Sequence, residues 1–471
     1  MKGGVRASDA PLPVQRLSVV NACGNRARYA CRRVARVLVL VLVLVLVAAA
    51  CGPAVGVDGS GGDGSGEGDA ASTAASEAGA SSGADASSGL PSAVCGDGSV
   101  AEREACDDGN ADELDGCDSQ CRVTGIELWQ VFLPPLSACP RLAALDDGGV
   151  ALLGNEQFVP DASIPHVLVL EGDGNVRWTF QGGHSQFDVA SDLVAEPGGF
   201  VVVGRGDSAP DGSVGWMQRW TADGVVDAEV FLGTDELGDQ ISNIERRDAA
   251  SYWIVGADGL GPRSLLFRGF DDPPTSATSL LVDAFDIQLA SGPAGGAYVT
   301  ADADAGTLTR VDREGVVIWS MQYTAPIDSV PYTLGLASTA SGDAIVSGTD
   351  QGEPDAQWIR RFGPDGSELW RVPVEVGDIP SADEPLHVTV DGADDIVVAG
   401  WSRKDTGNGG FLAKYDGDGV ERWRSIWRAQ AGLNVRPCDV VATSEGLILV
   451  AGSDFATGQE PDAYWVRAYA P

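Results

Sequence analysis

From residue 125 to the last residue, apolar and polar positions alternate with a period of two between turn signals. The clearest stretch is residues 411–423, FLAKYDGDGVERW, where two alternating runs flank Asp418 and Gly419. Such runs bounded by Asp-Gly predict β-hairpins, because glycine accepts the positive φ of a tight turn. A tryptophan four residues after the turn glycine recurs along the chain. The pairs are Gly125 and Trp129, Gly174 and Trp178, Gly315 and Trp319, Gly366 and Trp370, and Gly419 and Trp423.

A second hairpin alternates with the first, and it ends in a β-branched run that closes with glycine or alanine. Its seven copies end at residues 154, 204, 256, 301, 348, 400 and 452, which are 45 to 52 residues apart. A period near 50 residues with four short strands per unit is typical of β-propellers. We therefore predict an all-β fold over residues 125–471: a seven-bladed β-propeller of four-stranded antiparallel blades. The tryptophans, at a fixed register in the outer strands, are expected to pack between blades rather than to stack on sugars.

The two ends of the repeat region predict how the ring closes. The last blade has only three strands, because the chain ends with residues 463–471, AYWVRAYAP. The first strand, residues 126–132, has no partner before it and carries Trp129 at the outer-strand position. We expect this N-terminal strand to complete the last blade, which would protect two sheet edges. An open solenoid with frayed ends is the alternative.

Two cysteines fall on the first strands of the blades that would meet at this closure. Cys139 lies nine residues before the turn glycine Gly148, and Cys438 lies eight before Gly446. Both therefore sit at similar heights on equivalent strands, where a Cα separation within ~7 Å would permit a disulfide. We predict a disulfide between Cys139 and Cys438; two buried free thiols are the alternative.

The N-terminal region has the pattern of an export signal. Residues 1–36 are basic, residues 37–47 read VLVLVLVLVLV, and three alanines precede Cys51. This order is typical of a secretory signal peptide. The apolar run of 14 residues is short of the ~20 that span a bilayer, which disfavours the alternative of an uncleaved anchor. The Cys after small residues resembles a bacterial lipobox, and this resemblance implies that residues 1–50 are a lipoprotein signal peptide and that Cys51 is the lipid-attachment site.

By the same resemblance, Gly52 after the cysteine implies an outer-membrane, lipid-anchored protein facing the periplasm or the cell surface. Residues 51–94 are mostly Gly, Ser, Ala and Asp, with almost no large apolar residue. Such a segment cannot bury a core, so it is expected to be a disordered tether.

Residues 95–124 form a cysteine-rich module with Cys95, Cys106, Cys117 and Cys121. In an exported chain with no histidine nearby, four cysteines predict two disulfides that staple a small module, with the pairing left open. A zinc site with four cysteines normally has close pairs at both ends, and only Cys117 and Cys121 are close. The acidic cluster in this module admits Ca²⁺, although Asp and Asn with Gly also build tight turns, and we favour the turns. The candidate ligands are Asp107, Asp108, Asn110, Asp112 and Asp115.

These motifs resemble two kinds of bacterial surface repeat. The hairpin units over about 125–471 are similar to SBBP-type and PQQ-like propeller repeats. Residues 95–121 resemble the disulfide repeat of myxobacterial surface proteins, through CGDG, E-x-CDDGN, DGC and the last Cys. The resemblance implies the fold and carries no molecular role. A cofactor pocket such as PQQ enzymes require has no match in this sequence.

The charge balance disfavours nucleic acid as a partner and draws attention to an acidic face. A formal net charge of −37 disfavours nucleic acid, because phosphate contacts need Lys and Arg. If the strands run from axis to rim, the longer connections share one face, and binding residues concentrate on such loops. The candidate binding face is Asp207, Asp302, Asp304, Asp350, Asp405 and Asp454.

Enzyme chemistry is hard to place, and no catalytic residue is assigned. The chain has three histidines. His166 aligns with structural strand positions, and His184, the best general-base candidate, has no visible nucleophile. We expect a surface-anchored lipoprotein whose propeller binds or displays an extracellular protein or glycan, with no cofactor unless calcium. The alternative is a secreted hydrolase or quinone-type oxidoreductase. A polar pocket with His or Arg at the channel mouth would favour the enzyme, and an acidic face without a pocket would favour binding.

Overall fold

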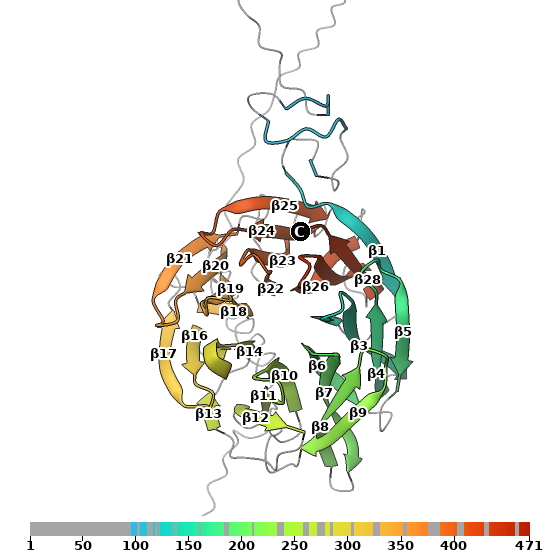
Figure 1. Ribbon diagram of the computed structural model, residues 1–471, viewed down its shortest axis with the longest axis vertical. Helices are drawn as coiled ribbons and strands as arrows, with labels where there is room; N and C mark the ends of the chain where they lie inside the picture. Colours follow the sequence, from blue (N-terminus) through green and yellow to red (C-terminus); the bar gives the residue numbers. More distant parts are fainter. Residues whose placement is uncertain are drawn as a thin grey trace, which may run out of the picture. The chain divides into compact units, whose positions relative to one another are not determined.

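The computed structural model describes residues 96–471 with short gaps, and its elements are shown in Figure 1. The gaps are 101–103, 111–115, 118–120, 122, 135, 137–138, 160–161, 183–187, 210–211, 233–239, 258–262, 271–277, 283–285, 303–305, 324–329, 352–355, 375–386, 403–408, 428–432 and 457–460. The predicted signal peptide (1–50), the tether (51–94), Cys51 and Cys95 lie outside the described residues. Within the described part, no helix is long and apolar enough to cross a membrane.

In the described residues, 28 strands form seven four-stranded antiparallel sheets around a central axis (Figure 1). The first three sheets are β2 (Arg141–Ala144), β3 (Val150–Val159), β4 (Ala162–Leu170) and β5 (Val176–Gln181); β6 (Val189–Glu196), β7 (Gly199–Ala209), β8 (Gly212–Thr221) and β9 (Val226–Leu232); and β10 (Gln240–Arg246), β11 (Ser251–Ala257), β12 (Arg263–Gly269) and β13 (Thr278–Val282). The next three are β14 (Asp286–Ser291), β15 (Ala297–Asp302), β16 (Gly306–Val311) and β17 (Val317–Tyr323); β18 (Val330–Ser338), β19 (Ala344–Gln351), β20 (Ala356–Phe362) and β21 (Glu368–Pro373); and β22 (His387–Val390), β23 (Ile396–Ser402), β24 (Gly409–Tyr415) and β25 (Glu421–Trp427). The first strand of each sheet is innermost, so the predicted four-stranded antiparallel blades are confirmed.

The ring closes through the N-terminal strand, as predicted. The last sheet contains β26 (Leu433–Ala442), β27 (Ile448–Ala456) and β28 (Pro461–Tyr469), and β1 (Glu127–Leu133) is added antiparallel to β28. Innermost strands β2 and β26 are in contact across this closure. The predicted disulfide between Cys139 and Cys438 is present, with a Cα–Cα distance of 5.3 Å. The closure is therefore held both by a strand ladder and by a covalent bond.

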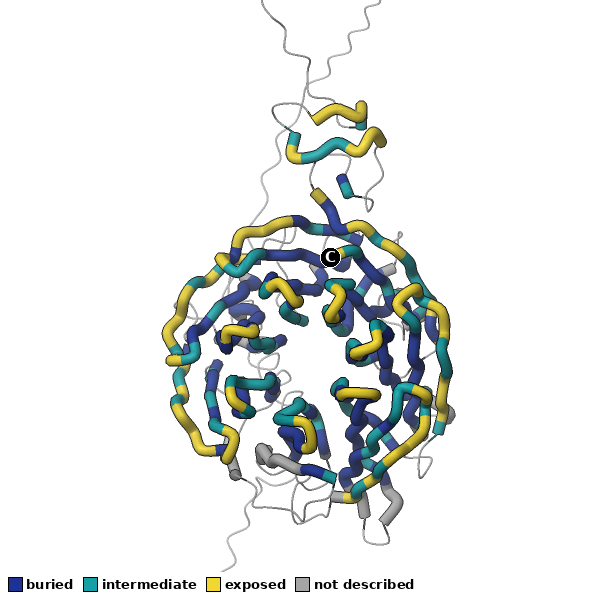
Figure 2. The backbone as a smooth tube through the Cα atoms, in the orientation of Figure 1, coloured by how far each residue is buried: buried dark blue, intermediate teal, exposed yellow. Residues whose placement is uncertain are grey.

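The core lies between blades, and β7 shows how one strand serves two interfaces. Phe200 and Val202 pack against the first blade, whereas Val201 and Val203 pack against the third. Successive side chains of a strand point to opposite faces, so a blade covered on both sides needs a continuous apolar run. Figure 2 shows the same division, with buried middle strands and exposed rims. This is why the second strand of each blade reads as a β-branched run rather than as an alternating one.

The recurring tryptophans pack on the turn of the next blade. The Trp178 indole N–H donates to the carbonyl oxygen of Ala222 at 2.7 Å, and a Cβ added to Gly224 would lie 2.9 Å from its ring. Equivalent bonds join Trp129 to Gly172, Trp319 to Pro364 and Trp370 to Gly417. Inter-blade packing of these tryptophans is thus confirmed.

We expect Gly419→Ala to lower the free energy of unfolding by about 2–3 kcal/mol. Gly419 has φ +81°, where a Cβ costs about 1–2 kcal/mol, and that Cβ would also lie 2.8 Å from Val372 of the preceding blade. Gly198→Ala is the matched control, because φ is +84° and no atom lies within 4 Å of the added Cβ. Denaturant unfolding of both variants measures the difference. Equal losses would show that the inter-blade contact adds nothing.

Candidate functional site

Each innermost strand carries one residue at the same register beside the central channel, and we call these seven residues the axial ring. In every blade, an apolar residue of the innermost strand pairs with the residue two before the terminal glycine or alanine, as Leu142 does with Leu152 and Val440 with Val450. The ring member is the residue just before that apolar residue on the innermost strand. The members are Arg141, Asp192, Asn243, Gln288, Gly335, His387 and Asp439. At this level of the channel, six of the seven blades therefore supply a polar side chain, and the fifth supplies Gly335.

Two carboxylates of the axial ring tie neighbouring blades together. Asp192 accepts a hydrogen bond from the backbone N–H of Ile244 at 3.0 Å, and Asp439 accepts one from Leu142 at 2.9 Å. Each acceptor reaches the same position of the next innermost strand. Burial raises the pKa of Asp192 to about 6 and raises that of Asp439, although the Arg141 charge and the backbone N–H groups oppose this. At this register, a carboxylate therefore serves as an inter-blade acceptor.

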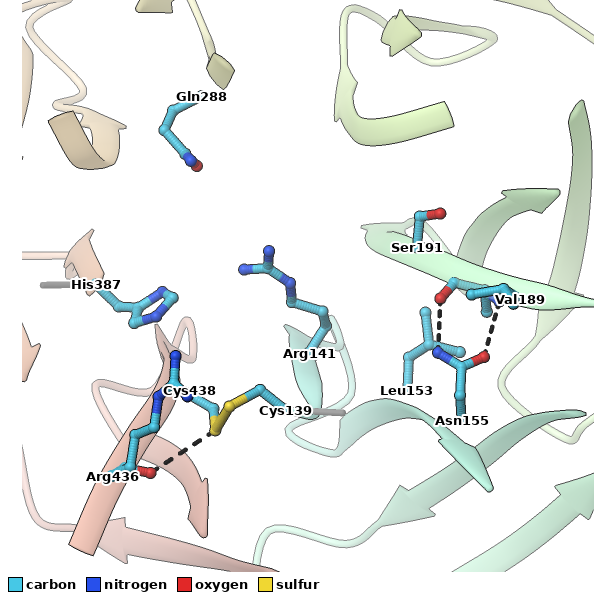
Figure 3. A pocket seen from close by; sticks show the side chains of 11 residues that line it. Cys139, Arg141, Leu153, Asn155, Val189, Ser191, Gln288, His387, Arg436 and Cys438 are labelled. Carbon is cyan, nitrogen blue, oxygen red and sulfur yellow. Dashed lines mark hydrogen bonds between the residues drawn. A yellow bond between two sulfur atoms is a disulfide. The ribbon is translucent and has the colours of Figure 1, made fainter. Parts of the chain in front are cut away.

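Arg141 occupies the same position in the first blade, but a guanidinium has only donors. Its side chain extends into the channel (Figure 3). In the part of the chain that the structure describes, we find no hydrogen bond or ion pair of this guanidinium. Its charge acts on Asp192, Asp439 and His387, whose pKa values it lowers. Arg141 therefore keeps donors available to a molecule in the channel.

Arg141 lines a cavity of about 420 Å³. Its wall includes Arg141, Arg436, His387, Gln288 and Ser191, and the Cys139–Cys438 disulfide completes one side. Arg141, Gln288 and His387 come from three blades and point toward the same open centre (Figure 3). The cavity lies where innermost strands begin and second strands end, which is the end of the channel that carries the longer connections. Among its described lining residues there are two arginines and no carboxylate.

His387 enters this cavity as a neutral imidazole. Burial, followed by the charges of Arg141 and Arg436, lowers the pKa of His387 to about 3. Its Nδ1 lies 3.9 Å from a carboxylate oxygen of Asp439, beyond hydrogen-bond range. A neutral ring donates with one nitrogen and accepts with the other, so His387 offers polar contacts without charge.

Two residues of the candidate binding face are committed to packing. Asp350 is buried; its carboxylate accepts the Trp358 indole N–H at 2.9 Å and pairs with Arg371 at 2.6 Å. Asp454 accepts the Trp465 indole N–H at 2.9 Å in the same way. Asp207 and Asp302 lie in β7 and β15, but their side chains are outside the description, as are Asp304 and Asp405 entirely.

The carboxylates of the cysteine-rich module bond to backbone amides. Asp107 accepts N–H groups of Gly96, Asp97, Gly98 and Gly109 at 2.8 to 3.1 Å. Although desolvation raises the pKa of Asp107, these four bonds lower it overall. Asp108 likewise accepts the N–H of Cys117 at 3.1 Å. These contacts are those of turn-building residues; Asp112 and Asp115 lie outside the described residues.

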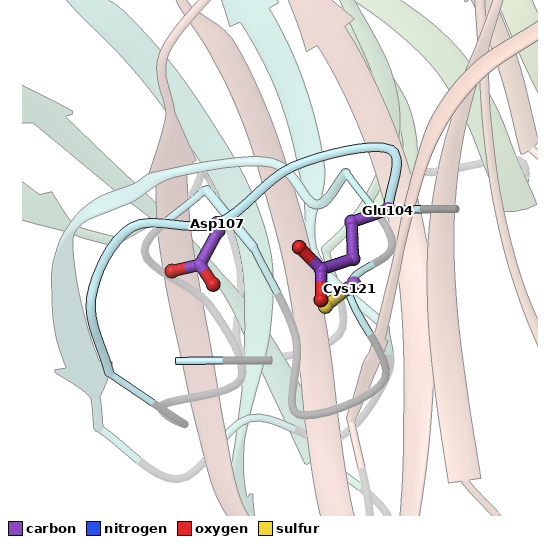
Figure 4. Close-up of side chains that lie close together, drawn as sticks. All are labelled: Glu104, Asp107 and Cys121. Carbon is purple, nitrogen blue, oxygen red and sulfur yellow. The ribbon is translucent and has the colours of Figure 1, made fainter. Parts of the chain in front are cut away.

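Disulfides also limit what this module offers a metal. Cys106 is bonded to Cys117, and Cys121 is disulfide-bonded too. Cys121 lies near Glu104 and Asp107 (Figure 4), with potential ligand atoms within 4.8 Å of one another. A metal ligand must be a thiolate, which a bonded sulfur is not. The grouping therefore gives calcium or zinc no further support.

The histidine predictions divide between described and undescribed residues. His166 is buried in β4, and its Nε2 lies 2.8 Å from the Thr179 hydroxyl, a position compatible with the predicted structural role. His184 lies outside the described residues. His387, which enters the cavity, was not singled out from the sequence. The sequence feature that could have identified it is its position 13 residues before the terminal glycine Gly400. Five other ring members lie 13 residues before the terminal glycine or alanine of their own blades.

Comparisons with known proteins find matches among solved structures. No family model matches this chain, and no curated protein matches it in sequence. The chain is a β-propeller, structurally similar to other propellers. The β-propeller domain of the Trilobed protease from Pyrococcus furiosus, described as having an open velcro topology, matches at 10% identity and a TM-score of 0.42, over 70% of this chain and 96% of that one. BBS1N, solved in complex with ARL6DN, matches at 10% identity and a TM-score of 0.45, over 74% and 98%. A protein of unknown function from Bacteroides caccae matches at 11% identity and a TM-score of 0.31, over 46% and 72%.

We expect Glu245→Gln to flatten the pH dependence of stability between about pH 4.5 and 7. Burial raises the pKa of Glu245 to about 7, Ser291 lowers it by hydrogen bonding, and the Asp192 charge raises it. In this window the folded chain binds more protons than the unfolded chain, so this group's contribution to stability is lost as pH rises. The variant should gain about 1–3 kcal/mol relative to wild type from pH 4.5 to 7.5.

Urea midpoints at several pH values measure this effect. Glu314→Gln is the control, because that side chain is 66% exposed and should leave the wild-type profile unchanged. A parallel shift of the Glu245→Gln profile, with no change of slope, would contradict the prediction.

Proposed function

We propose that this protein is a surface-anchored lipoprotein whose propeller is an extracellular binding scaffold, with the axial cavity as its ligand site. Cys51 carries the lipid, residues 51–94 hold the folded part away from the outer membrane, and the ligand is a small polar molecule, free or at the end of a glycan. The partners are the membrane, through the lipid, and an extracellular protein or glycan that presents the ligand; nucleic acid is not among them.

The observation that carries the proposal is the convergence of Arg141, Gln288 and His387 on one cavity (Figure 3). Its volume of about 420 Å³ falls in the range of small-ligand sites. The residues come from rigid innermost strands of different blades, so the site is preorganised. Preorganised polar groups favour binding because little side-chain freedom is lost when a ligand enters.

A hydrolase or quinone-type oxidoreductase is the second candidate, since a cavity with histidine and arginine was the feature expected to favour an enzyme. Two observations weigh against catalysis in this cavity. A base with a pKa near 3, such as His387, takes protons poorly at neutral pH. The two cysteines in the wall are bonded to each other and cannot act as thiolate nucleophiles.

Binding to full-length protein purified in detergent tests the ligand site. Ser191 lines the cavity, so Ser191→Phe should occlude it and abolish saturable binding of small acids, sugars and glycans. Val225→Phe is the control, at an exposed turn position that is 60% accessible. Binding by both variants would refute the axial site, and turnover of a bound probe would establish the enzyme instead.

A separate experiment tests the anchor. Cys51→Ser should release the protein from the membrane fraction or block its processing. Unchanged membrane association would indicate that residues 37–50 act as an uncleaved anchor.

A further inference from the structure

We propose that the axial cavity binds a small hydroxylated carboxylate, such as a sugar acid or a hydroxy acid, through the guanidinium of Arg141. This inference rests on the proposed function, because it names the class of ligand that the same cavity would take. It begins with a contrast in charge. The chain has 68 acidic and 31 basic residues, yet the described cavity wall holds Arg141 and Arg436 and no carboxylate.

The axial ring explains why Arg141 is the anchor. At the same register, Asp192 and Asp439 use their carboxylates to accept backbone N–H groups of the next blade. An arginine cannot make that bond, so it contributes nothing to this inter-blade link. Instead its planar donors face the channel (Figure 3), where they match the two oxygens of a carboxylate.

The neighbouring carboxylates of Asp192 and Asp439 do not form hydrogen bonds with the Arg141 guanidinium. The inter-blade bonds hold one oxygen of Asp439 on Leu142 and one of Asp192 on Ile244, away from hydrogen-bond contact with Arg141. Their charges oppose an anion, and the positive charge of Arg436, which lines the same cavity, offsets this. The balance favours one negative group at Arg141 rather than a polyanion.

The rest of the wall selects a hydroxylated molecule. Gln288, Ser191 and the neutral imidazole of His387 line the cavity, and together they provide uncharged donors and acceptors. Hydroxyl groups satisfy both kinds of partner, whereas an apolar ligand would give the Ser191 hydroxyl and the His387 ring no polar contact. A sugar ring with one carboxylate fits within about 420 Å³.

Calorimetric titration of full-length protein with glucuronate, glucose 6-phosphate and glucose tests the inference. We expect glucuronate to bind more tightly than glucose, and Arg141→Gln to weaken glucuronate about 10- to 100-fold. Arg141→Lys should recover part of this loss, because it keeps the charge without the planar fork. Arg313→Gln is the control, since Arg313 is 55% exposed at a turn and should leave the affinity unchanged. Thermal unfolding confirms that each variant is folded.

The outcomes separate the inference from the proposed function. Glucuronate binding that persists in Arg141→Gln but disappears in Ser191→Phe would overturn the anchor and keep the axial site. Binding of glucose 6-phosphate without binding of glucuronate would overturn the carboxylate assignment. If the wild-type protein binds neither glucuronate nor other sugar acids, the ligand class is wrong. If it binds no small molecule in a way that Ser191→Phe abolishes, the proposed function is wrong as well.

Discussion

Replacing Cys139 and Cys438 together by serine should lower the free energy of unfolding by about 3–5 kcal/mol. The disulfide spans 299 residues, and the chain-entropy model assigns roughly 5 kcal/mol to a loop of this length. Cys438 is also only 2% exposed, so a serine hydroxyl at that position would be buried. The first and last blades would then be joined by the β1–β28 ladder and by side-chain packing. Guanidinium unfolding of both proteins under non-reducing conditions measures the loss.

The second resolved disulfide supplies the control. Cys106 and Cys117 are 11 residues apart in the cysteine-rich module, outside the blades. Replacing them should leave the unfolding midpoint of the propeller close to that of wild type. A double variant of Cys139 and Cys438 that unfolds at the wild-type midpoint would show that the strand ladder alone secures the ring.

The architecture was predictable because each blade repeats its own local signals. Hairpins need glycine where φ is positive, and Gly419 at +81° has equivalents at Gly174, Gly224, Gly315 and Gly366. Once the register of the turns is known, the unpaired strands at the two ends must be partners, and this places Cys139 beside Cys438. Local chemistry with a fixed period therefore determined both the blades and their closure.

The terminal glycines were more difficult to interpret from sequence. As strand ends, they predict that Asp350 and Asp454 lie on loops, and this prediction is wrong. In fact β19 and β27 continue beyond Gly348 and Gly452, and the two acids lie within paired strands. A Cβ at Gly452 would lie 2.2 Å from the Trp465 ring, so this glycine makes room for a tryptophan on the third strand. The requirement comes from a cross-strand contact, which a single strand does not reveal.

The candidate site was not predictable for a related reason. The axial ring takes one residue from each blade, and its members are about 50 residues apart in the sequence. Six of the seven members lie 13 residues before the terminal glycine or alanine, which is visible in the sequence, but innermost strands β6, β10, β18 and β26 contain bulges that break the simple alternation. Only the assembled ring shows that Arg141, Gln288 and His387 share a cavity.

Replacing Trp358 by alanine should lower the free energy of unfolding by about 3–5 kcal/mol, the usual cost of removing a large buried aromatic side chain. Trp358 is fully buried in β20 and meets Tyr323 edge to face at 5.7 Å. The Arg360 guanidinium lies 4.4 Å from its ring centroid, which adds a cation–π contact in a water-poor position. Its indole N–H also satisfies the buried carboxylate of Asp350.

Trp358→Phe separates packing from this hydrogen bond. Phenylalanine keeps most of the apolar contact but leaves Asp350 without the indole donor, so it should cost about 1–2 kcal/mol. The Arg371 guanidinium, 2.6 Å from the other carboxylate oxygen, limits the loss because it still pairs with Asp350. Trp319→Ala is the comparison at the blade rim, where the ring is only half-buried, and a smaller loss is expected there. Equal destabilisation by Trp358→Ala and Trp319→Ala in denaturant unfolding would contradict the central place of Trp358 in the packing between the fourth and fifth blades.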